Sequence, residues 1–406
     1  MGKLSIRQVP FYLIIFIDNL SVSLVLPVLI PITYDQHAGL LPHADSVQQN
    51  MVYGLAIGLY SIAMFFGSPW LGALSDLLRR GRTLIICLLG LILGYLVTAW
   101  AILEKNLFLF LLGRVICGLS SGSLPVAQAA IMDVTPRERR VAALSQIMFW
   151  VSVGYVAGPL IGGYLSDSTV VSWFNLTTPF LVVAGTSLLN LAILLVSYRE
   201  PADEGSLPFS RPKPFSRLIE AFRTPGIRLL SLVLLLLSLG WTAYFQFIGL
   251  YLSAQKDYSQ QMVGNLIAVL GVGLAGAFLF FVPLLAQKLR SRQTIPTALL
   301  ILALCLGVTP LIDHRWLLTA VGLVSAIGYG TSYSSLIGLM SVSADDEHQG
   351  SVMGMAAAIA AVTAGTSGVF FGFVSGSSPV PILSASVLTI FAFLLSLRIN
   401  GDGYNT

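Results

Sequence analysis

Residues Gly154-Tyr155-Val156-Ala157-Gly158-Pro159-Leu160-Ile161-Gly162-Gly163 place four glycines and a proline inside a long apolar stretch. In lipid, apolar contact alone does not hold helices together, so small residues at intervals of four let two backbones approach and gain dispersion contacts. Proline removes a backbone donor, which is tolerable in a membrane helix where neighbouring groups satisfy the freed carbonyl. The tract therefore predicts a membrane helix that packs closely and bends.

The composition of the whole chain agrees with this reading. Of 406 residues, 56% are hydrophobic and only 10% are charged, and the mean hydropathy is +0.85, whereas soluble domains have about 25% charged residues. The net charge of +4 is scattered along the chain, so a nucleic-acid partner is not expected. The three cysteines lie in apolar blocks without metal-ligand spacing. We predict an all-α polytopic membrane protein with no metal site.

Apolar blocks separated by polar breaks predict twelve transmembrane helices, each long enough to cross a hydrocarbon core about 30 Å thick. The weakest division is the short turn at residues 103–106, between the third and fourth helices. The predicted spans are 11–32, 51–74, 83–103, 107–133, 141–165, 174–198, 228–253, 262–287, 293–312, 316–340, 349–375 and 379–398.

The distribution of Lys and Arg gives an orientation. With the N-terminus inside, segments on the cytoplasmic side hold 18 of the 22 Lys and Arg residues. Outside segments hold Lys105, Lys256 and Arg315, and Arg114 lies within a helix. The positive-inside rule therefore predicts that both termini are cytoplasmic. The expected location is the bacterial inner membrane.

The longest hydrophilic stretch follows the sixth predicted helix and contains four prolines with charges of both signs. It reads as a cytoplasmic linker at residues 199–227, between six-helix bundles at residues 1–198 and 228–406. Two pseudo-symmetric bundles with a substrate path between them are typical of secondary transporters. The tract from Gln349 to Gly376 weakly repeats the glycine-rich fifth helix but lacks its proline.

Between the second and third helices the chain reads Gly72-Ala73-Leu74-Ser75-Asp76-Leu77-Leu78-Arg79-Arg80-Gly81-Arg82. A carboxylate at a helix end next to arginines forms charge-assisted pairs that hold two bundles in one conformation and release them in another. The alternative is that the arginines only set topology and Asp76 is a solvated loop acid.

Together these segments resemble the major facilitator superfamily. The Asp76 segment resembles its signature loop, with Arg79 where the family usually has glycine, so that Arg80 and Arg82 are both eligible for the gating role. The resemblance implies that Asp133, at the end of the fourth helix, and Arg139 after it belong to the same conformational motif. Gly154, Gly158, Pro159, Gly162 and Gly163 resemble the fifth-helix antiporter motif of its exporters.

Arg114 lies well inside the fourth span, where a charge is costly unless it faces a cavity or a counter-charge. Its surroundings resemble the family's Arg-x-x-Gln-Gly motif, although Cys117 replaces the glutamine. Snorkelling to the interface is the alternative, because the residue lies roughly 10 Å from the outer edge.

Asp18 is the acid of the first helix, roughly 10 Å from the cytoplasmic edge. Apolar surroundings favour the neutral form of a carboxyl group, so this residue is a candidate for taking up and releasing protons. A helix boundary placed too early, or a structural hydrogen bond, would explain it without transport. The spacing from Asp18 to Pro27 resembles the first helix of tetracycline-type exporters. The third helix lacks the internal acid of those exporters and the eighth lacks their histidine, so a shared mechanism with a different substrate is expected.

Other polar and aromatic residues inside spans are candidates for the substrate cavity, although packing explains any one of them equally well. They are Asn19, Gln128, Gln146, Trp150, Tyr244, Gln246, Tyr329 and Tyr333.

These observations predict a secondary active transporter that exports a small amphipathic organic molecule, a drug or a secreted metabolite, in exchange for protons by alternating access. It is expected to work as a monomer in the bilayer, without a cofactor. An importer or uniporter, or an exporter of a metabolite or siderophore, fits the same fold. A membrane enzyme or receptor is the remote alternative, because the four histidines lie in loops without a catalytic arrangement.

Overall fold

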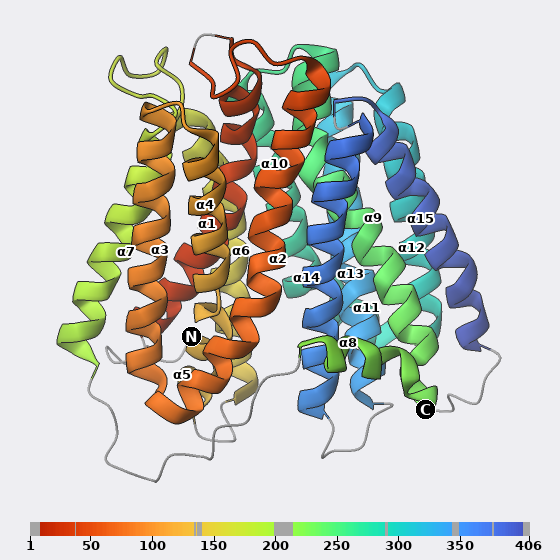
Figure 1. Cartoon of the computed structure of the whole chain (residues 1–406). Coiled ribbons are helices and arrows are strands. Elements are labelled where there is room, and N and C mark those ends of the chain that lie inside the picture. The colour runs from red at the N-terminus through yellow and green to blue at the C-terminus, as the bar shows by residue number, and fades with distance from the viewer. Residues whose placement is uncertain are drawn as a thin grey trace.

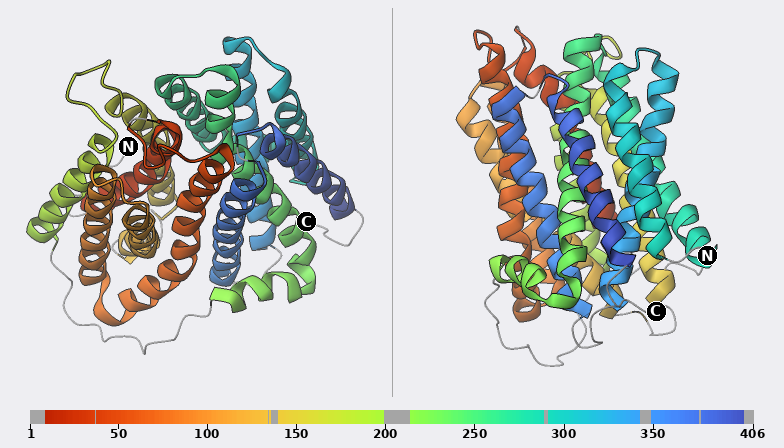
Figure 2. Two further views of the ribbon diagram at one scale, coloured as in Figure 1. Left: turned by 45° about the horizontal axis from the view of Figure 1, so that its top comes forward. Right: turned by 90° about the vertical axis from the view of Figure 1, so that its right-hand side faces the viewer.

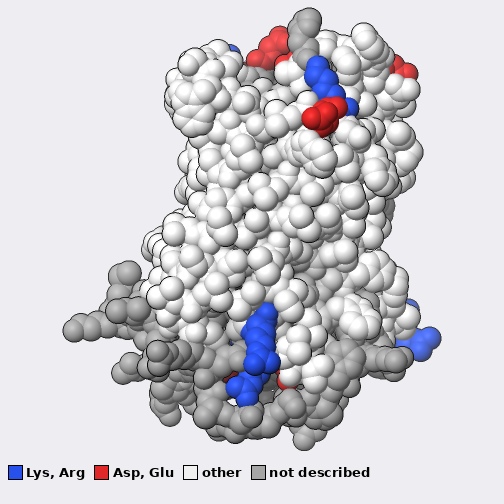
Figure 3. All heavy atoms as spheres, turned by 60° about the vertical axis from the view of Figure 1, so that its left-hand side comes forward, with Lys and Arg blue, Asp and Glu red and all other residues white. Residues whose placement is uncertain are grey.

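The computed structural model describes residues 9–36, 38–133, 135, 140–198, 214–288, 291–342, 349–375 and 377–400. Within these ranges the chain is helical and contains no β-strand. The long helices run side by side and form two bundles (Figure 1). On the face shown in Figure 3, Lys, Arg, Asp and Glu gather at the two ends of the molecule and leave an uncharged band between them. Such a band suits a protein surrounded by lipid.

The first half contains the helices that precede residue 198. They are α1 (Val9–Tyr34), α2 (Ser46–Leu78), α3 (Arg80–Leu103), α4 (Leu107–Ser120), α5 (Ser123–Asp133), α6 (Arg140–Leu165) and α7 (Thr178–Ser197). The short predicted turn between the third and fourth spans is confirmed, because α3 ends at Leu103 and α4 begins at Leu107. The predicted fourth span is not one continuous helix, since the turn at Ser121 and Gly122 divides it into α4 and α5.

The second half begins with a short helix that the sequence did not predict, α8 (Pro214–Arg223), within the proposed linker. The long helices follow. They are α9 (Pro225–Lys256), α10 (Gln260–Gly276) continued by the π-helix η3 (Ala277–Phe281) and by α11 (Val282–Lys288), α12 (Ser291–Val308) with the 3-10 turn η4 (Thr309–Leu311), α13 (Arg315–Val342), α14 (Gln349–Ser375), and α15 (Val380–Ser396) with η6 (Leu397–Asn400).

Among the described residues, eleven of the twelve predicted spans form helices that are long and apolar enough to cross a membrane. The remaining one, α13, is 28 residues long. Its apolar character is diluted by the small and hydroxyl-bearing run at residues 328–335, Gly-Tyr-Gly-Thr-Ser-Tyr-Ser-Ser. It packs against α10 and α12 inside the second half, so it completes a six-helix set.

Several helices begin with a side chain that satisfies a free backbone donor. Asp45 accepts a hydrogen bond from the backbone N–H of Gln48 at 2.8 Å and starts α2. Asn106 does the same at the start of α4, and Ser259 at the start of α10. Each is a residue type favoured at this position because its oxygen reaches the first turn. The polar breaks between spans therefore also define where the helices begin.

The glycine tract of α6 packs directly against the backbone of α1. A Cβ atom added to Gly158 would lie 2.2 Å from Ser23 Oγ and 2.5 Å from the Leu20 carbonyl oxygen, and one on Gly162 would lie 2.3 Å from the Leu24 carbonyl oxygen. No side chain fits at these separations, so glycine is required. The close helix packing expected of this tract is confirmed.

Glycines also join the two halves, along two seams at one end of the molecule. In the α6–α10 seam, a Cβ on Gly264 would lie 2.5 Å from the Pro159 carbonyl oxygen. In the α2–α14 seam, a Cβ on Gly54 would lie 2.4 Å from the Gly368 carbonyl oxygen and 2.5 Å from the Gly372 Cα. We call this the Gln260 end, after the first residue of α10, and the opposite end the α8 end. α1 begins and α15 ends on the α8 side (Figures 1 and 2).

Replacing Gly158 with alanine is expected to lower the free energy of unfolding by about 1–3 kcal/mol, because the backbone of α1 occupies the space that a methyl group needs. The measurement is thermal unfolding of the purified protein in detergent. Gly185→Ala in α7 is the matched control, since nothing lies within 4 Å of a Cβ there, and a helix-interior alanine is expected to stabilise by about 1 kcal/mol. Equal effects of the two changes would contradict this account of the tract.

Candidate functional site

A cavity of about 1490 Å³ lies between the two halves. Its wall extends from Asp18 on α1 and Gln246 on α9 to Asp76 on α2 and Glu220 on α8. Because the glycine seams bring the halves together at the Gln260 end, the helices diverge toward the α8 end and leave this space. A cavity of this size, mostly apolar with a few polar groups, suits an organic ligand.

Asp18 lies in the cavity wall, and its side chain is only 8% exposed. Ser123, the first residue of α5, donates a hydrogen bond from Oγ to Asp18 Oδ2 at 2.6 Å. This contact spans 105 positions of sequence, and the break between α4 and α5 places the serine there. Burial penalises the charged carboxylate, whereas the hydroxyl donor stabilises it.

Arg114, on α4, also lies in the cavity wall and is 3% exposed. Its Nε donates to the backbone carbonyl oxygen of Ala56 at 3.1 Å. Its guanidinium carbon lies 4.6 Å from the ring centre of Tyr60, a cation–π distance. The Tyr60 hydroxyl and Ser121 Oγ share a hydrogen bond of 2.6 Å. The side chain is held inside the protein, which excludes the snorkelling alternative in this conformation.

The second half supplies an aromatic wall, which we define as Trp241, Phe245, Tyr329 and Tyr333, all lining the cavity. The Trp241 and Tyr329 rings are stacked, with centroids 4.4 Å apart and an interplanar angle of 8°. Trp241 also stacks on Phe245 at 5.9 Å, and Tyr329 lies 5.7 Å from Tyr333. The four rings therefore pack against one another as one aromatic cluster in the cavity wall, with Trp241 only 5% exposed.

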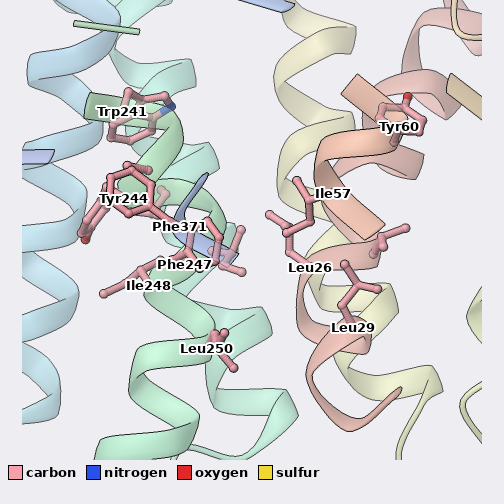
Figure 4. Packing of buried hydrophobic residues seen from close by; sticks show 14 of the residues in the cluster. Leu26, Leu29, Ile57, Tyr60, Trp241, Tyr244, Phe247, Ile248, Leu250 and Phe371 are labelled. Atoms are coloured by element: carbon pink, nitrogen blue, oxygen red, sulfur yellow. The ribbon is translucent and has the colours of Figure 1, made fainter. Parts of the chain in front are cut away.

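The cavity includes five of the eight predicted substrate residues: Asn19, Gln128, Gln246, Tyr329 and Tyr333. The other three pack elsewhere. Gln146 accepts a hydrogen bond from the Tyr12 hydroxyl at 2.8 Å, and Trp150 packs edge-on against Phe16 and Phe149. Tyr244, 1% exposed, belongs to the apolar core of the second half beside Trp241 (Figure 4).

The turn between α2 and α3 brings three polar side chains onto Arg80. Its Nη1 donates to Asp76 Oδ1 at 2.7 Å and to Ser75 Oγ at 2.5 Å, and its Nε donates to Asp133 Oδ2 at 3.1 Å. Of the two arginines left eligible by the sequence, Arg80 therefore makes these pairs. All of these residues belong to the first half, so in this conformation the cluster ties α2, α3 and α5 together.

The other members of the predicted conformational motif differ in their surroundings. Gly72 lines the cavity, and nothing lies within 4 Å of an added Cβ, so close packing does not require glycine there. Arg82 lies in the first turn of α3 and is exposed. Arg139 lies outside the described residues.

Polar side chains join the two halves at the Gln260 end. Ser166 Oγ donates to Gln260 Oε1 at 2.8 Å, and Gln261 Nε2 donates to Asp167 Oδ2 at 2.9 Å. The Thr169 hydroxyl and Gln261 amide, as donors to the carboxylate, lower the pKa of Asp167. The backbone of Gly163 approaches Gln260 at the same place. These contacts close the cavity at the Gln260 end, opposite α8.

Two residues of the site escaped the sequence analysis. Ser123 and Tyr60 are ordinary apolar-span residues by composition, and only their contacts with Asp18 and Arg114 give them significance. The run of small residues at 120–123, Ser-Ser-Gly-Ser, was the available signal, because it weakens a helix and permits the break that positions Ser123.

Comparison with known proteins places this arrangement among transporters. The Major Facilitator Superfamily model matches residues 11–369. The tetracycline resistance protein, class C, of Escherichia coli is 27% identical over 349 residues, which cover 86% of this chain and 84% of that protein. The quinolone resistance protein NorA of Staphylococcus aureus is 26% identical over 326 residues, covering 78% and 77%.

Solved structures share the fold at lower identity. A bacterial homologue of the human lysosomal transporter Spinster, in an inward-facing and unoccupied conformation, superposes with a TM-score of 0.76 at 16% identity and covers 97% of this chain and 98% of its own. A D-xylose-proton symporter superposes with a TM-score of 0.71 at 13% identity, covering 96% of each chain.

Arg79, between α2 and α3, adopts φ 76° and ψ 157°, a region that is essentially restricted to glycine. Arg79→Gly is therefore expected to raise the free energy of unfolding by about 1–2 kcal/mol, after allowing for the greater chain entropy of glycine. Thermal unfolding in detergent measures this. Arg82→Gly, the control within helix α3, removes the same charge and is expected to destabilise by about 0.5–1 kcal/mol. A loss of stability in both variants would contradict the strain assigned to Arg79.

Proposed function

Because this chain belongs to the Major Facilitator Superfamily, whose model matches residues 11–369, we propose that it exports a small amphipathic organic molecule in exchange for protons. The chain is a multi-pass membrane protein and a secondary transporter, not an enzyme. The proton gradient is the energy source in this proposal, and no cofactor is needed. The described residues contain no group of three or more His, Cys, Asp or Glu side chains arranged for a metal ion.

The observation that carries proton exchange is the buried Asp18 in the cavity wall, with its hydrogen bond from Ser123. A carboxyl group near the middle of a membrane protein is costly when charged, so it binds a proton while enclosed and releases it when water reaches the site. The other acids of the described lining, Asp76 and Glu220, lie toward the α8 end. Asp18 is thus the acid placed at the depth where substrate and proton would compete.

Export of drug-like molecules is supported by the named relatives, which are tetracycline and quinolone resistance proteins. The mostly apolar cavity with its aromatic wall fits an amphipathic organic cargo. The departures from tetracycline-type exporters noted above favour a different cargo, a drug or a secreted metabolite. Import or uniport on the same scaffold is tested by the experiment below.

The proposed location is the bacterial inner membrane, with both termini and α8 on the cytoplasmic side. This orientation rests on the 18 of 22 Lys and Arg residues in segments on that side. The cavity then faces the cytoplasm, as an exporter that loads its cargo there requires. We propose that the transporter works as a monomer, because one chain supplies both walls of the cavity.

Alternating access would close the α8 end and open the glycine seams. We propose that the Arg80 cluster with Asp76 and Asp133 sets the position of α2 during this change, and that Gly72 and Arg139 contribute when the halves meet at this end. The Gly154–Gly163 tract has backbone contacts with both α1 and α10, so it is suited to act as the antiporter element between the halves.

Asp18→Asn is expected to abolish efflux driven by a pH gradient, because asparagine keeps the shape of the side chain but binds no proton. The measurement is uptake of tetracycline, a quinolone and ethidium into everted vesicles under an imposed pH gradient. Asp45→Asn is the matched control, since Asp45 is an exposed cap of α2 and asparagine caps equally well. Loss of gradient-driven transport is expected in the first variant alone.

Three results would contradict the proposal. Full gradient-driven transport by Asp18→Asn would remove the proton role of that residue. Transport by the unmodified protein that persists after the gradient is collapsed would indicate a uniporter. Movement of the compounds in the opposite direction would indicate an importer.

A further inference from the structure

The short helix α8 lies crosswise at the end of the molecule toward which the cavity opens. It packs against α9 and α14 of the second half and also reaches α2 of the first half (Figures 1 and 2). Ala221 is fully buried and Phe222 packs against the main apolar core. Ser216 and Glu220 line the cavity. α8 is therefore fixed to the second half, and one side of it faces the space between the halves.

Three phenylalanine rings join α8 to α2. The Phe215 ring centre lies 5.3 Å from that of Phe65, at an interplanar angle of 70°, and 5.8 Å from that of Phe66, at 65°. The Phe65 and Phe66 ring centres are 5.2 Å apart at 77°. Each pair is edge-to-face, an arrangement that the quadrupoles of aromatic rings favour. We call these three residues the ring triad.

The same place includes a contact with α14. Phe65, which is 6% exposed, forms an apolar cluster with Ala358 and Ala361 of α14. Leu218 of α8 packs against this cluster. The cluster and the ring triad together join α2, α8 and α14 at the α8 end of the molecule.

α2 and α14 touch at the glycine seam and are separated by side chains at the ring triad. At the seam, a Cβ on Gly58 would lie 3.1 Å from the Gly365 carbonyl oxygen, so the two backbones meet. Phe65 follows Gly58 on α2 by about 10 Å along the helix axis. There the space between the diverging helices is filled by Phe65 and, from α8, by Phe215 and Leu218.

We propose that α8 acts as a spacer that stabilises the conformation in which the cavity is open at the α8 end, with Phe215 as its positioning residue. This role rests on the proposed alternating access, in which closing this end brings α2 toward α14 and into the space that Phe215 and Leu218 occupy. A contact made in only one of two conformations stabilises that conformation. The described lining of the cavity includes neither residue, so the spacer acts on the helices and not on the cargo.

Distances between pairs of spin labels measure the two conformations in the purified full-length protein, without a pH gradient. One pair is attached at the α8 end through Leu77→Cys in α2 and Arg228→Cys in α9. The other is attached at the Gln260 end through Trp173→Cys and Trp316→Cys. All four positions are exposed. Cys305→Ala removes the native thiol that is partly exposed, and the other two cysteines are buried.

Phe215→Ala is expected to lower the ratio of molecules open at the α8 end to molecules closed there about tenfold, because two edge-to-face contacts of the open conformation are lost. The α8-end pair then moves toward its shorter distance and the Gln260-end pair toward its longer one. Phe215→Tyr keeps the ring and is expected to keep the populations of the unmodified protein. Phe108→Ala, at a ring of α4 that is 74% exposed, is the matched control and is expected to change neither distance.

Two results would overturn the spacer role. One is unchanged populations in a folded Phe215→Ala variant. The other is a shift of the α8-end pair toward longer distances, which would make α8 a tie that limits opening. Thermal unfolding confirms that each variant is folded, and the truncated ring is already 55% exposed. Phe66→Ala, which removes the same triad from the side of α2, is a second variant and is expected to shift the populations in the same direction.

The two proposals fail separately. An unmodified protein that performs gradient-driven efflux, with populations that do not respond to Phe215→Ala, retains the proposed function and loses the spacer. A protein whose populations shift as expected, but which transports nothing under a gradient, retains the spacer and loses the export function.

Discussion

The architecture depends on helix backbones that touch at glycines. In a bilayer the lipid tails are as apolar as leucine, so helices associate through short-range packing rather than through removal of apolar surface from water. The tract on α6 contacts α1 through Gly158 and Gly162 and contacts α10 through the Pro159 carbonyl oxygen. One helix thereby joins its own half and connects that half to the other.

The second seam repeats this solution with different residues. Gly54 of α2 meets Gly368 and Gly372 of α14 without any intervening side chain. Both seams lie toward the Gln260 end. The halves diverge from there, and the cavity between them opens toward the α8 end. The side-chain hydrogen bonds of Ser166 with Gln260 and of Gln261 with Asp167 add to these backbone contacts at the same end.

The two walls of the cavity differ in chemistry. The first half contributes buried ionisable side chains, Asp18 and Arg114, each held by neighbours within that half. The second half contributes stacked rings and one amide. A ligand that contacts both walls contacts both halves of the molecule.

The sequence by itself determined the fold class, the number and order of the spans, and the residues able to carry charge inside the membrane. These properties follow from the length of apolar blocks and from the cost of charge in lipid, which are local. Tertiary structure alone decided which polar groups meet. Asp18 pairs with Ser123 across 105 positions, and Trp241 lines the cavity while Tyr244, on the same helix, is buried in the core. A helix presents its side chains to several neighbours, and the packing angle and register that assign each one to a cavity or a core depend on contacts made by the whole bundle.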